Sequence, residues 1–313
     1  MRAKEPWQSF GRYVRIPLRC GRGLHKGGAT GLEDRAENQP EAGDRCSRSR
    51  AERMGIKDMK IIEIKNMELL APLFAHWQET MIWSCLEGSM GQAFAPAGGA
   101  PRAALLQVAD FCFLAGEPCA ELAAWRPAGA GDFSILAPQH EGWAAAIEAA
   151  WGQKARRCAR YAFHKTAEGF DPAALARFAA ALPPGYGLRP MGREEYRQAL
   201  ASGWGARDLC AQFADERDYC RRGLGVAVLQ EGRLVAGASS YTVYRGGIEI
   251  EIDTHPDHRR RGLARACGAA LMLECLKRGL YPSWDAQNPA SAALAKSLGY
   301  RFDREYPVYE VRA

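Results

Sequence analysis

The sequence has no hydrophobic run long enough to form a membrane-spanning helix. Such a helix needs about 18 or more consecutive apolar residues, and every apolar stretch of this chain is interrupted well before that length. Hydrophobic residues make up 47% of the 313 positions and charged residues 25%, a balance typical of globular proteins. We therefore expect about two domains, a cytoplasmic location and no membrane partner.

Paired cysteines are also missing. The ten cysteines are spread singly, with no C-x-x-C pair, and Cys85, Cys267 and Cys275 lie among apolar residues, where cysteine behaves as a small hydrophobic side chain. His255 and His258 are close in sequence, but no further Cys or His lies near them, and a structural zinc usually takes about four ligands. These patterns predict reduced thiols and no metal site.

The net positive charge outside the first 58 residues is small. The net charge is +6, but residues 1–58 hold 13 Lys and Arg against 8 Asp and Glu, which leaves +1 for residues 59–313. A near-neutral folded part gives no electrostatic support for a nucleic-acid partner. Residues 1–58 lack both a helical or strand period and the apolar centre of a secretory signal. We expect a disordered basic extension there, with Met54 or Met59 as an alternative start.

The first structured part is expected over residues 59–185. Its hydrophobic patterns predict an α/β unit with strands over 60–64, 103–116, 133–138 and 156–165, and helices over 68–86, 140–152 and 171–182. Asp171 and Pro172 suit the N-cap and first position of the last helix. The "PPGYG" segment at 183–187 then interrupts the pattern, and we place a domain boundary there.

A second unit is expected over residues 186–313. The pattern predicts a strand over 186–191, helices over 192–201 and 206–222, and three antiparallel strands over 224–230, 233–244 and 248–254. A helix over 261–278, a strand over 281–286, a helix over 288–298 and a strand over 300–311 are expected to follow. Few polar residues interrupt the helix over 261–278, so we expect it to be buried. Asn288 and Pro289 open the last helix, and Gly299 ends it.

The segment "IEIEIDTHPDHRRRGLA" at 248–264 joins an alternating strand to this buried helix. The first amides of a helix lack partners and carry partial positive charge, so they bind anions. Gly262 allows close approach of a phosphate, and Arg259, Arg260 and Arg261 add positive charge. The pattern therefore indicates a phosphate site; the alternative is a solvated basic turn.

The motif R-x-x-G-x-A at 259–264 resembles the pyrophosphate motif of GNAT acyltransferases. The order of elements over 186–313 is similar to that fold. "IEIDTHPDHRRRGLA", "YPSWDAQN" and "LAKSLGYRFDREYPVY" resemble more closely the zwittermicin A resistance-like branch of the family. The resemblance implies a GNAT fold, an α+β arrangement with a mixed sheet, in the second half. Residues 59–185 have no such motif, and we expect there a degenerate GNAT-like half that supplies walls of the acceptor pocket; the alternative is a separate partner-binding domain.

The resemblance also implies acetyl-CoA as the acyl donor. Its pyrophosphate would lie on the amides of 260–264, its pantetheine along the preceding strand, and the next helix start beside it. The implied coenzyme-binding residues are Ile252, Asp253, Thr254, Arg259, Arg260, Arg261, Gly262, Leu263, Ala264, Asn288 and Ser291.

Two glutamates on the same strand are candidates for a general base. Acetyl transfer to an amine needs an ammonium proton removed, and a nearby carboxylate can accept it. Glu249 and Glu251 share a face by period-two alternation, although a bulge would change this. We favour Glu251; the alternative is that both acids form the solvent face of the strand.

The position at which many GNAT enzymes carry an acidic Tyr is Ala295 here. Tyr300, Tyr306 and Tyr309 are other candidates for the acid, and none is assigned. The sequence thus favours an N-acetyltransferase acting on a primary amine of a small molecule, such as an aminopolyol or antibiotic, as a monomer or homodimer. The alternatives are a non-catalytic acyl-CoA-binding module and a peptide or protein acetyltransferase.

Overall fold

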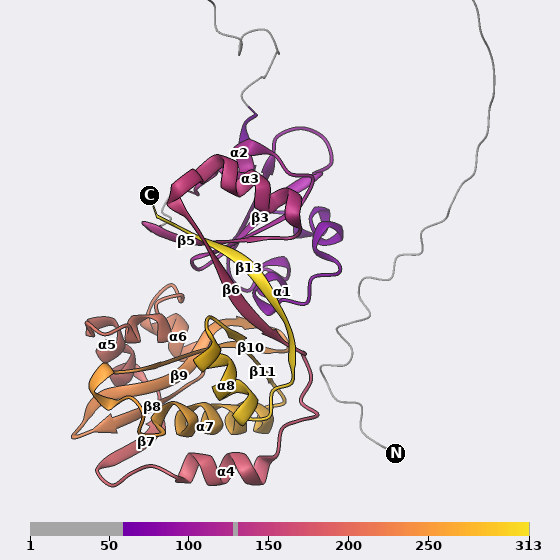
Figure 1. The fold of residues 1–313 in the computed structure, drawn as a ribbon. Coiled ribbons are helices and arrows are strands. Elements are labelled where there is room, and N and C mark those ends of the chain that lie inside the picture. Colours follow the sequence, from indigo (N-terminus) through magenta and orange to yellow (C-terminus); the bar gives the residue numbers. More distant parts are fainter. Residues whose placement is uncertain (1–58, 128–130, 313) are drawn as a thin grey trace, which may run out of the picture.

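The computed structural model describes residues 59–127 and 131–312, which form two β-sheets with helices packed around them (Figure 1). The expectations for residues 1–58 lie outside this described part. None of the described helices is both long and apolar enough to span a bilayer. The mixed α/β class predicted from the sequence is confirmed.

The first sheet has eight strands in the order β1-β2-β3-β4-β5-β13-β6-β12. Only the β4–β5 pair is parallel. The strand predicted over 103–116 is two strands, because the chain reverses at Ala109, whose φ of 56° is the left-handed conformation of a tight turn. The bounds are β1 Ile61–Glu63, β2 Gln92–Pro96, β3 Ala103–Val108, β4 Phe111–Gly116, β5 Phe133–Pro138, β6 Ala155–Phe163, β12 Asp285–Ala286 and β13 Phe302–Arg312.

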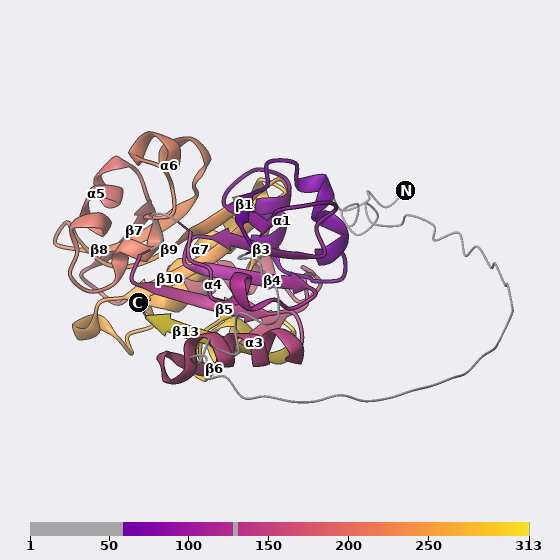
Figure 2. The same ribbon diagram turned by 90° about the horizontal axis from the view of Figure 1, so that it is seen from above.

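The prediction of one continuous helix over 68–86 is wrong. The chain forms two short 3₁₀ turns, Met67–Leu69 and Ala71–Phe74, before α1, Thr80–Leu86. Pro72 sits in the first turn of the second of these, where its missing N–H costs no hydrogen bond, whereas a helix running through it would lose one. Helix α1 packs on one face of this sheet, and helices α2, Ala120–Ala123, and α3, Glu141–Trp151, pack on the opposite face (Figure 1). Figure 2 shows α1 and α3 from above.

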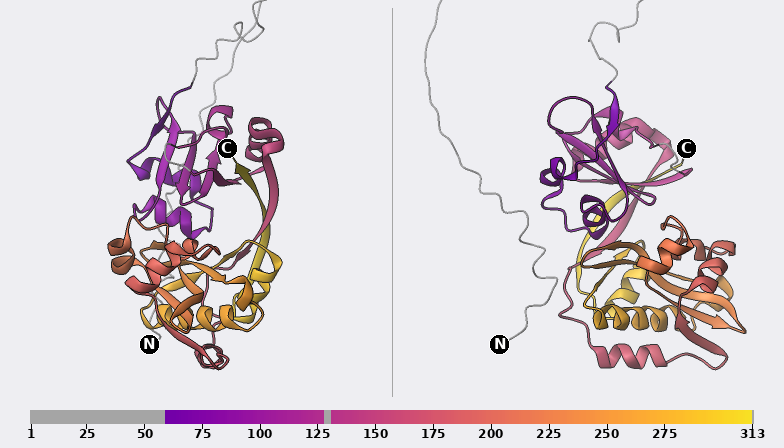
Figure 3. Two further views of the ribbon diagram at one scale, coloured as in Figure 1. Left: turned by 90° about the vertical axis from the view of Figure 1, so that its left-hand side faces the viewer. Right: turned by 180° about the vertical axis from the view of Figure 1, so that it is seen from behind.

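The second sheet has the order β11-β10-β9-β8-β7, and β10 and β11 are its parallel pair. Helix α7 covers one of its faces, with α4 packed on the outer side of α7 (Figure 3). Cys267, Leu271 and Cys275 of α7 are fully buried, as the apolar pattern predicted. The bounds are β7 Tyr186–Pro190, β8 Gly225–Gln230, β9 Arg233–Tyr244, β10 Gly247–Thr254, β11 Tyr281–Ser283, α4 Pro172–Ala180, α5 Arg193–Ala201, α6 Glu216–Arg222, α7 Leu263–Lys277 and α8 Pro289–Ser297.

Two segments predicted for the second half belong to the first sheet. The strand predicted over 281–286 divides at Trp284, so that β11 pairs with β10 while β12 pairs with β6. Strand β13 lies between β5 and β6 and runs from one sheet towards the other (Figure 1). Alternation in the sequence indicates which side chains share a face, but not which strand lies alongside. The boundary near residue 185 stays a prediction.

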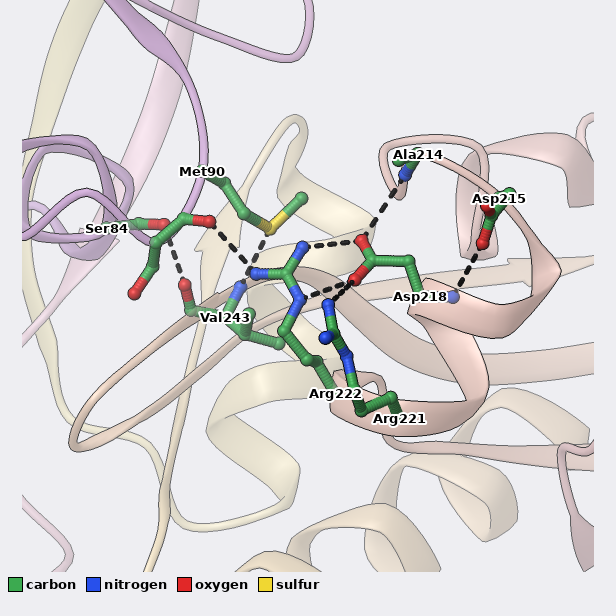
Figure 4. Close-up of polar contacts among 9 residues, drawn as sticks. Ser84, Met90, Ala214, Asp215, Asp218, Arg221, Arg222 and Val243 are labelled. Atoms are coloured by element: carbon green, nitrogen blue, oxygen red, sulfur yellow. Dashed lines mark hydrogen bonds and ion pairs between the residues drawn. The ribbon is translucent and has the colours of Figure 1, made fainter.

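The two sheets are also joined through α1 and the loop after it (Figure 4). The Ser84 hydroxyl donates to the Val243 carbonyl of β9 at 2.7 Å. From α6, Arg222 Nη1 donates to the Ser89 carbonyl at 2.9 Å. These contacts hold α1 and the loop after it against the second sheet.

Candidate active site

A cavity of about 1010 Å³ lies between the two sheets and the start of α7. It opens because β10 pairs with β11 only from Gly247 to Glu249, after which the chain that follows β11 turns to the first sheet. The remainder of β10, residues 250–254, therefore has a free edge on this side and lines the cavity. Both halves of the chain contribute to the wall.

One end of the cavity is the N-terminus of α7. Gly262 is its N-cap, with φ 79° and no side-chain cap, so within the described ranges no side chain caps the first amides of the helix. A Cβ at Gly262 would meet no atom within 4 Å, so the turn presents bare backbone to the cavity. Arg260 also has a positive φ, of 63°. This end fits a phosphate group.

The three arginines of the turn are placed differently. Arg259 and Arg260 line the cavity, and Arg259 Nε donates to the Thr254 carbonyl at 3.1 Å. Arg261 does not line it, because its guanidinium donates to the Tyr186 hydroxyl at 2.8 Å and to the carbonyl of Asp257 at 3.1 Å. The other ten residues of the implied coenzyme-binding set all line the cavity.

The middle of the cavity has polar groups that suit an amide-containing ligand such as pantetheine. Thr254 Oγ1 is buried and has no hydrogen-bond partner within the described ranges. Asn288 caps α8 by accepting from the Ser291 amide at 2.9 Å, and the Ser291 hydroxyl accepts from Trp284 Nε1 at 3.2 Å. A buried hydroxyl without a partner is costly, so Thr254 is a group that a ligand would satisfy.

The two candidate glutamates both line the cavity despite a bulge between them. Glu249 lies opposite Thr242 and Ile250 lies opposite Ser240, so the extra residue is Tyr241 on the neighbouring strand β9. Strand β10 itself keeps its period-two alternation, and its acids stay on one face.

The bulged Tyr241 also lines the cavity, and its hydroxyl donates to Asp110 of the first half. The bulge thus places a hydrogen bond between the two halves in the cavity wall.

Glu251 is half-buried, and its carboxylate makes no hydrogen bond with any residue that the structure describes. Burial raises the pKa of Glu251 to about 8, and the charges of Asp208 and Asp253 act in the same direction, while Arg160 opposes them. A carboxyl group with this pKa is mostly protonated at pH 7 and becomes able to accept a proton as the pH rises through about 8.

Glu249 is only 3% exposed and accepts a hydrogen bond from the Thr80 hydroxyl of α1. Burial raises its pKa, and the Lys165 ammonium opposes that effect. Lys165 Nζ in turn donates to the Ser283 hydroxyl of β11 at 2.8 Å, beside the point where β10 and β11 separate. The Glu249 carboxylate is therefore fixed by a hydrogen bond, whereas the Glu251 carboxylate makes none within the described ranges.

Acidic residues surround Glu251, and we call Asp110, Asp208, Glu251 and Asp253 the acidic wall. Arg160 also lines this region, but it is paired with Asp285. Sequence reasoning missed Asp110, Asp208 and Arg160, because each lies outside any motif and reaches the cavity only through the pairing of distant strands.

The positions considered for a general acid lie elsewhere. Ala295 is fully buried in the core and does not line the cavity. The hydroxyls of Tyr300, Tyr306 and Tyr309 donate to the Pro282 carbonyl, Asp285 and Glu148, and none of these tyrosines lines the cavity. Within the described ranges, no group of three or more His, Cys, Asp or Glu is arranged to hold a metal.

A family model for GNAT acetyltransferases matches residues 71–309 of this chain. The chain belongs to the GNAT acetyltransferase family. A crystal structure of a GCN5-related N-acetyltransferase-like protein from Streptococcus suis is 41% identical with a TM-score of 0.74, and the match covers 79% of this chain and 98% of that one. The GNAT fold that the 259–264 motif and the order of elements implied is thereby confirmed.

Two further relatives match shorter segments. The uncharacterized N-acetyltransferase YdfB of Bacillus subtilis is 32% identical over 93 residues, or 29% of this chain and 36% of the relative. The ribosomal protein bS18-alanine N-acetyltransferase of Escherichia coli is 35% identical over 82 residues, or 25% of this chain and 55% of the relative. The chain thus spans about a third to a half of these curated relatives.

Proposed function

We propose that this GNAT protein transfers the acetyl group of acetyl-CoA to a primary amine of a small molecule. GNAT acetyltransferases use acetyl-CoA, which supplies the acetyl group as a reactive thioester. The observation that carries the proposal is the placement of the unbonded Glu251 carboxylate in the same cavity as the uncapped N-terminus of α7. The N-terminus of α7 can bind the phosphates of the donor, and the Glu251 carboxylate can accept a proton from the amine.

The residues of the cavity have separate tasks in this proposal. The first amides of α7, together with Arg259 and Arg260, bind the pyrophosphate. Thr254 donates to or accepts from the pantetheine amides along the free edge of β10. Glu251 removes the proton of the acceptor ammonium, directly or through one water, so that the nitrogen lone pair can attack the thioester carbonyl.

The acidic wall supports a cationic acceptor. An amine enters as an ammonium, and the clustered carboxylates stabilise that charge before Glu251 accepts the proton. The resemblance of residues 250–264, 281–288 and 294–309 to the zwittermicin A resistance-like branch would favour an aminopolyol or antibiotic as the acceptor. The cavity, with a volume of about 1010 Å³, has room for both donor and acceptor.

The test is thiol release from acetyl-CoA, with a panel of monoamines, diamines, aminopolyols and short peptides as acceptors. We expect release with small cationic amines and little release with peptides. Turnover with peptides alone would favour a protein acetyltransferase. Tight acetyl-CoA binding without thiol release for any amine, with the same acetyl-CoA affinity in Glu251→Gln, would favour a non-catalytic binding module.

A further inference from the structure

Three side chains form a hydrogen-bonded chain beside the start of α7. Arg261 Nη1 donates to the Tyr186 hydroxyl at 2.8 Å, and that hydroxyl lies 2.9 Å from His258 Nδ1. Tyr186 begins β7, whereas the other two residues belong to the turn before α7. Of the three, only His258 lines the cavity.

The direction of the first hydrogen bond in this chain is fixed. A guanidinium carries only N–H donors, so the Tyr186 oxygen accepts from Arg261. The hydroxyl hydrogen then has one acceptor within the described ranges, His258 Nδ1. When the hydroxyl donates to Nδ1, that nitrogen carries no proton, and the proton of the neutral imidazole is on Nε2.

The ring of His258 is also held in orientation. It lies edge-on to Tyr186, with 5.8 Å between ring centroids, and edge-on to His255 at 5.4 Å. His255 contacts Trp204 in the same manner at 5.5 Å. These contacts restrict rotation of the imidazole, and a donor held in place before binding loses little entropy when its partner arrives.

We propose that Arg261 and Tyr186 set the tautomer of His258 so that its Nε2–H donates to a phosphate oxygen of the coenzyme at the α7 N-terminus. His258 is then a binding residue, and Tyr186 and Arg261 are positioning residues. Arg261, which alone of the implied set does not line the cavity, thus acts through two other side chains. The inference rests on the proposed placement of the coenzyme phosphates.

Calorimetric titration with coenzyme A tests the contact. We expect His258→Ala to weaken binding about tenfold or more, the loss of a hydrogen bond to a charged group, and Tyr186→Phe about threefold, because the donor is then only partly in the right tautomer. In the His258→Ala background, Tyr186→Phe should have no further effect. Additive losses would overturn the proposal.

Pantetheine, which has no phosphate, locates the contact. His258→Ala should bind it as the unmodified protein does, and equal weakening for both ligands would overturn the proposal. Asp257→Asn is the matched control, since Asp257 belongs to the same turn but its side chain is 85% exposed and does not line the cavity. It should keep coenzyme A affinity within about twofold, although it can lower the melting temperature. A loss as large as that of His258→Ala would assign the effect to the turn instead.

Long-range ¹H–¹⁵N spectra of the free protein report the tautomer directly. We expect a protonated Nε2 and an unprotonated Nδ1 for His258, and a mixture of tautomers in Tyr186→Phe. The opposite tautomer in the unmodified protein would overturn the proposal.

Gly262→Val separates the failure of this inference from the failure of the phosphate placement. If Gly262→Val leaves coenzyme A affinity unchanged, the phosphate placement itself fails. If Gly262→Val abolishes binding but His258→Ala does not weaken it, only this inference fails.

Discussion

The Arg160 guanidinium donates from Nε to Asp285 Oδ1 at 2.5 Å and from Nη2 to the Asp285 carbonyl at 3.2 Å. The two side chains are only 13% and 1% exposed, and the Tyr306 hydroxyl donates to the other carboxylate oxygen at 2.8 Å. The pair joins β6 to β12 in the cavity wall. Because Asp285 neutralises much of its charge, Arg160 reduces the negative potential around Glu251 without cancelling it.

Replacing Arg160 should change both stability and pH dependence. In Arg160→Gln, loss of the cation that lowers the pKa of Glu251 should move the acidic limb of kcat/KM to higher pH. The unpaired Asp285 should lower the free energy of unfolding by about 3–5 kcal/mol, measured by chemical denaturation. Arg160→Lys keeps the charge, so its acidic limb should stay close to that of the unmodified protein.

Asp208→Asn should move the acidic limb in the opposite direction. Asp208 is, after burial, the largest cause of the raised pKa of Glu251, so its neutralisation should shift the limb of kcat/KM to lower pH. The pKa of the amine acceptor is the same in every variant and cannot produce opposite shifts. If Arg160→Gln and Asp208→Asn move the limb in the same direction, Glu251 is not the titrating group.

The strand-to-helix junction of the site was predictable because it depends on local sequence. Strand alternation up to Thr254, the glycine at 262 and the apolar run after it specify the turn, and the structure has β10, the Gly262 N-cap and α7 at these places. The hairpin of β8 and β9 and the capping of α8 by Asn288 were predictable for the same reason.

The rest of the cavity depends on pairings between distant segments. Arg160 reaches it because β6 pairs with β12, and Asp110 because its turn meets the bulged Tyr241. The alternating pattern of β13 gives its two faces but not its place between β5 and β6. Periodicity carries no information about such partners, so the contribution of Asp110 and Asp208 to the acidic wall could not be predicted from the sequence.

Gly262→Val should abolish measurable binding of acetyl-CoA in calorimetry. The branched side chain would project into the cavity where the phosphates are proposed to lie, and the φ of 79° adds backbone strain of about 1–3 kcal/mol. Gly232→Val is a matched control, because Gly232 has a φ of 78° and equally open surroundings in the β8–β9 turn, away from the cavity. It should lose comparable stability but keep its affinity.

Arg259→Ala should weaken acetyl-CoA binding by about 1–3 kcal/mol and not abolish it, because the backbone amides remain. Titration calorimetry at two salt concentrations checks this, since a contact between charges weakens as ionic strength rises. An unchanged affinity would mean that Arg259 serves only to hold the Thr254 carbonyl.

Asp218 should stabilise the fold in a pH-dependent way (Figure 4). Its hydrogen bonds from Arg222, at 2.6 and 2.8 Å, hold its pKa well below the usual range. This stabilisation is present above the unfolded pKa of about 3.9 and is lost as pH falls towards the lower folded pKa.

Asp218→Asn should therefore lower the free energy of unfolding by about 1.5–3 kcal/mol at pH 7, and by less as the pH approaches 3. Arg221→Ala is the control: Arg221 also donates to Asp218 but is 71% exposed, so its loss should cost less than about 1 kcal/mol. A difference for Asp218→Asn that does not depend on pH would contradict the assignment.

Glu251→Gln is the most direct test of the catalytic proposal, since it keeps the shape of the side chain and removes the base. We expect kcat to fall by about 10²–10⁴-fold, with acetyl-CoA affinity near that of the unmodified protein. The unmodified enzyme should gain activity as pH rises through about 8, where Glu251 loses its proton and can accept that of the acceptor. That limb should be absent from the residual activity of the variant.

Glu249→Gln is its matched partner. Glu249 is hydrogen-bonded to Thr80 and lies near Lys165, so its neutralisation should lower the melting temperature and leave the limb near pH 8 in place. A loss of that limb in Glu249→Gln, with normal turnover in Glu251→Gln, would exchange the two roles. Normal turnover in both variants and in the double variant would mean that neither carboxylate removes the proton, and that water or another group of the acidic wall does so.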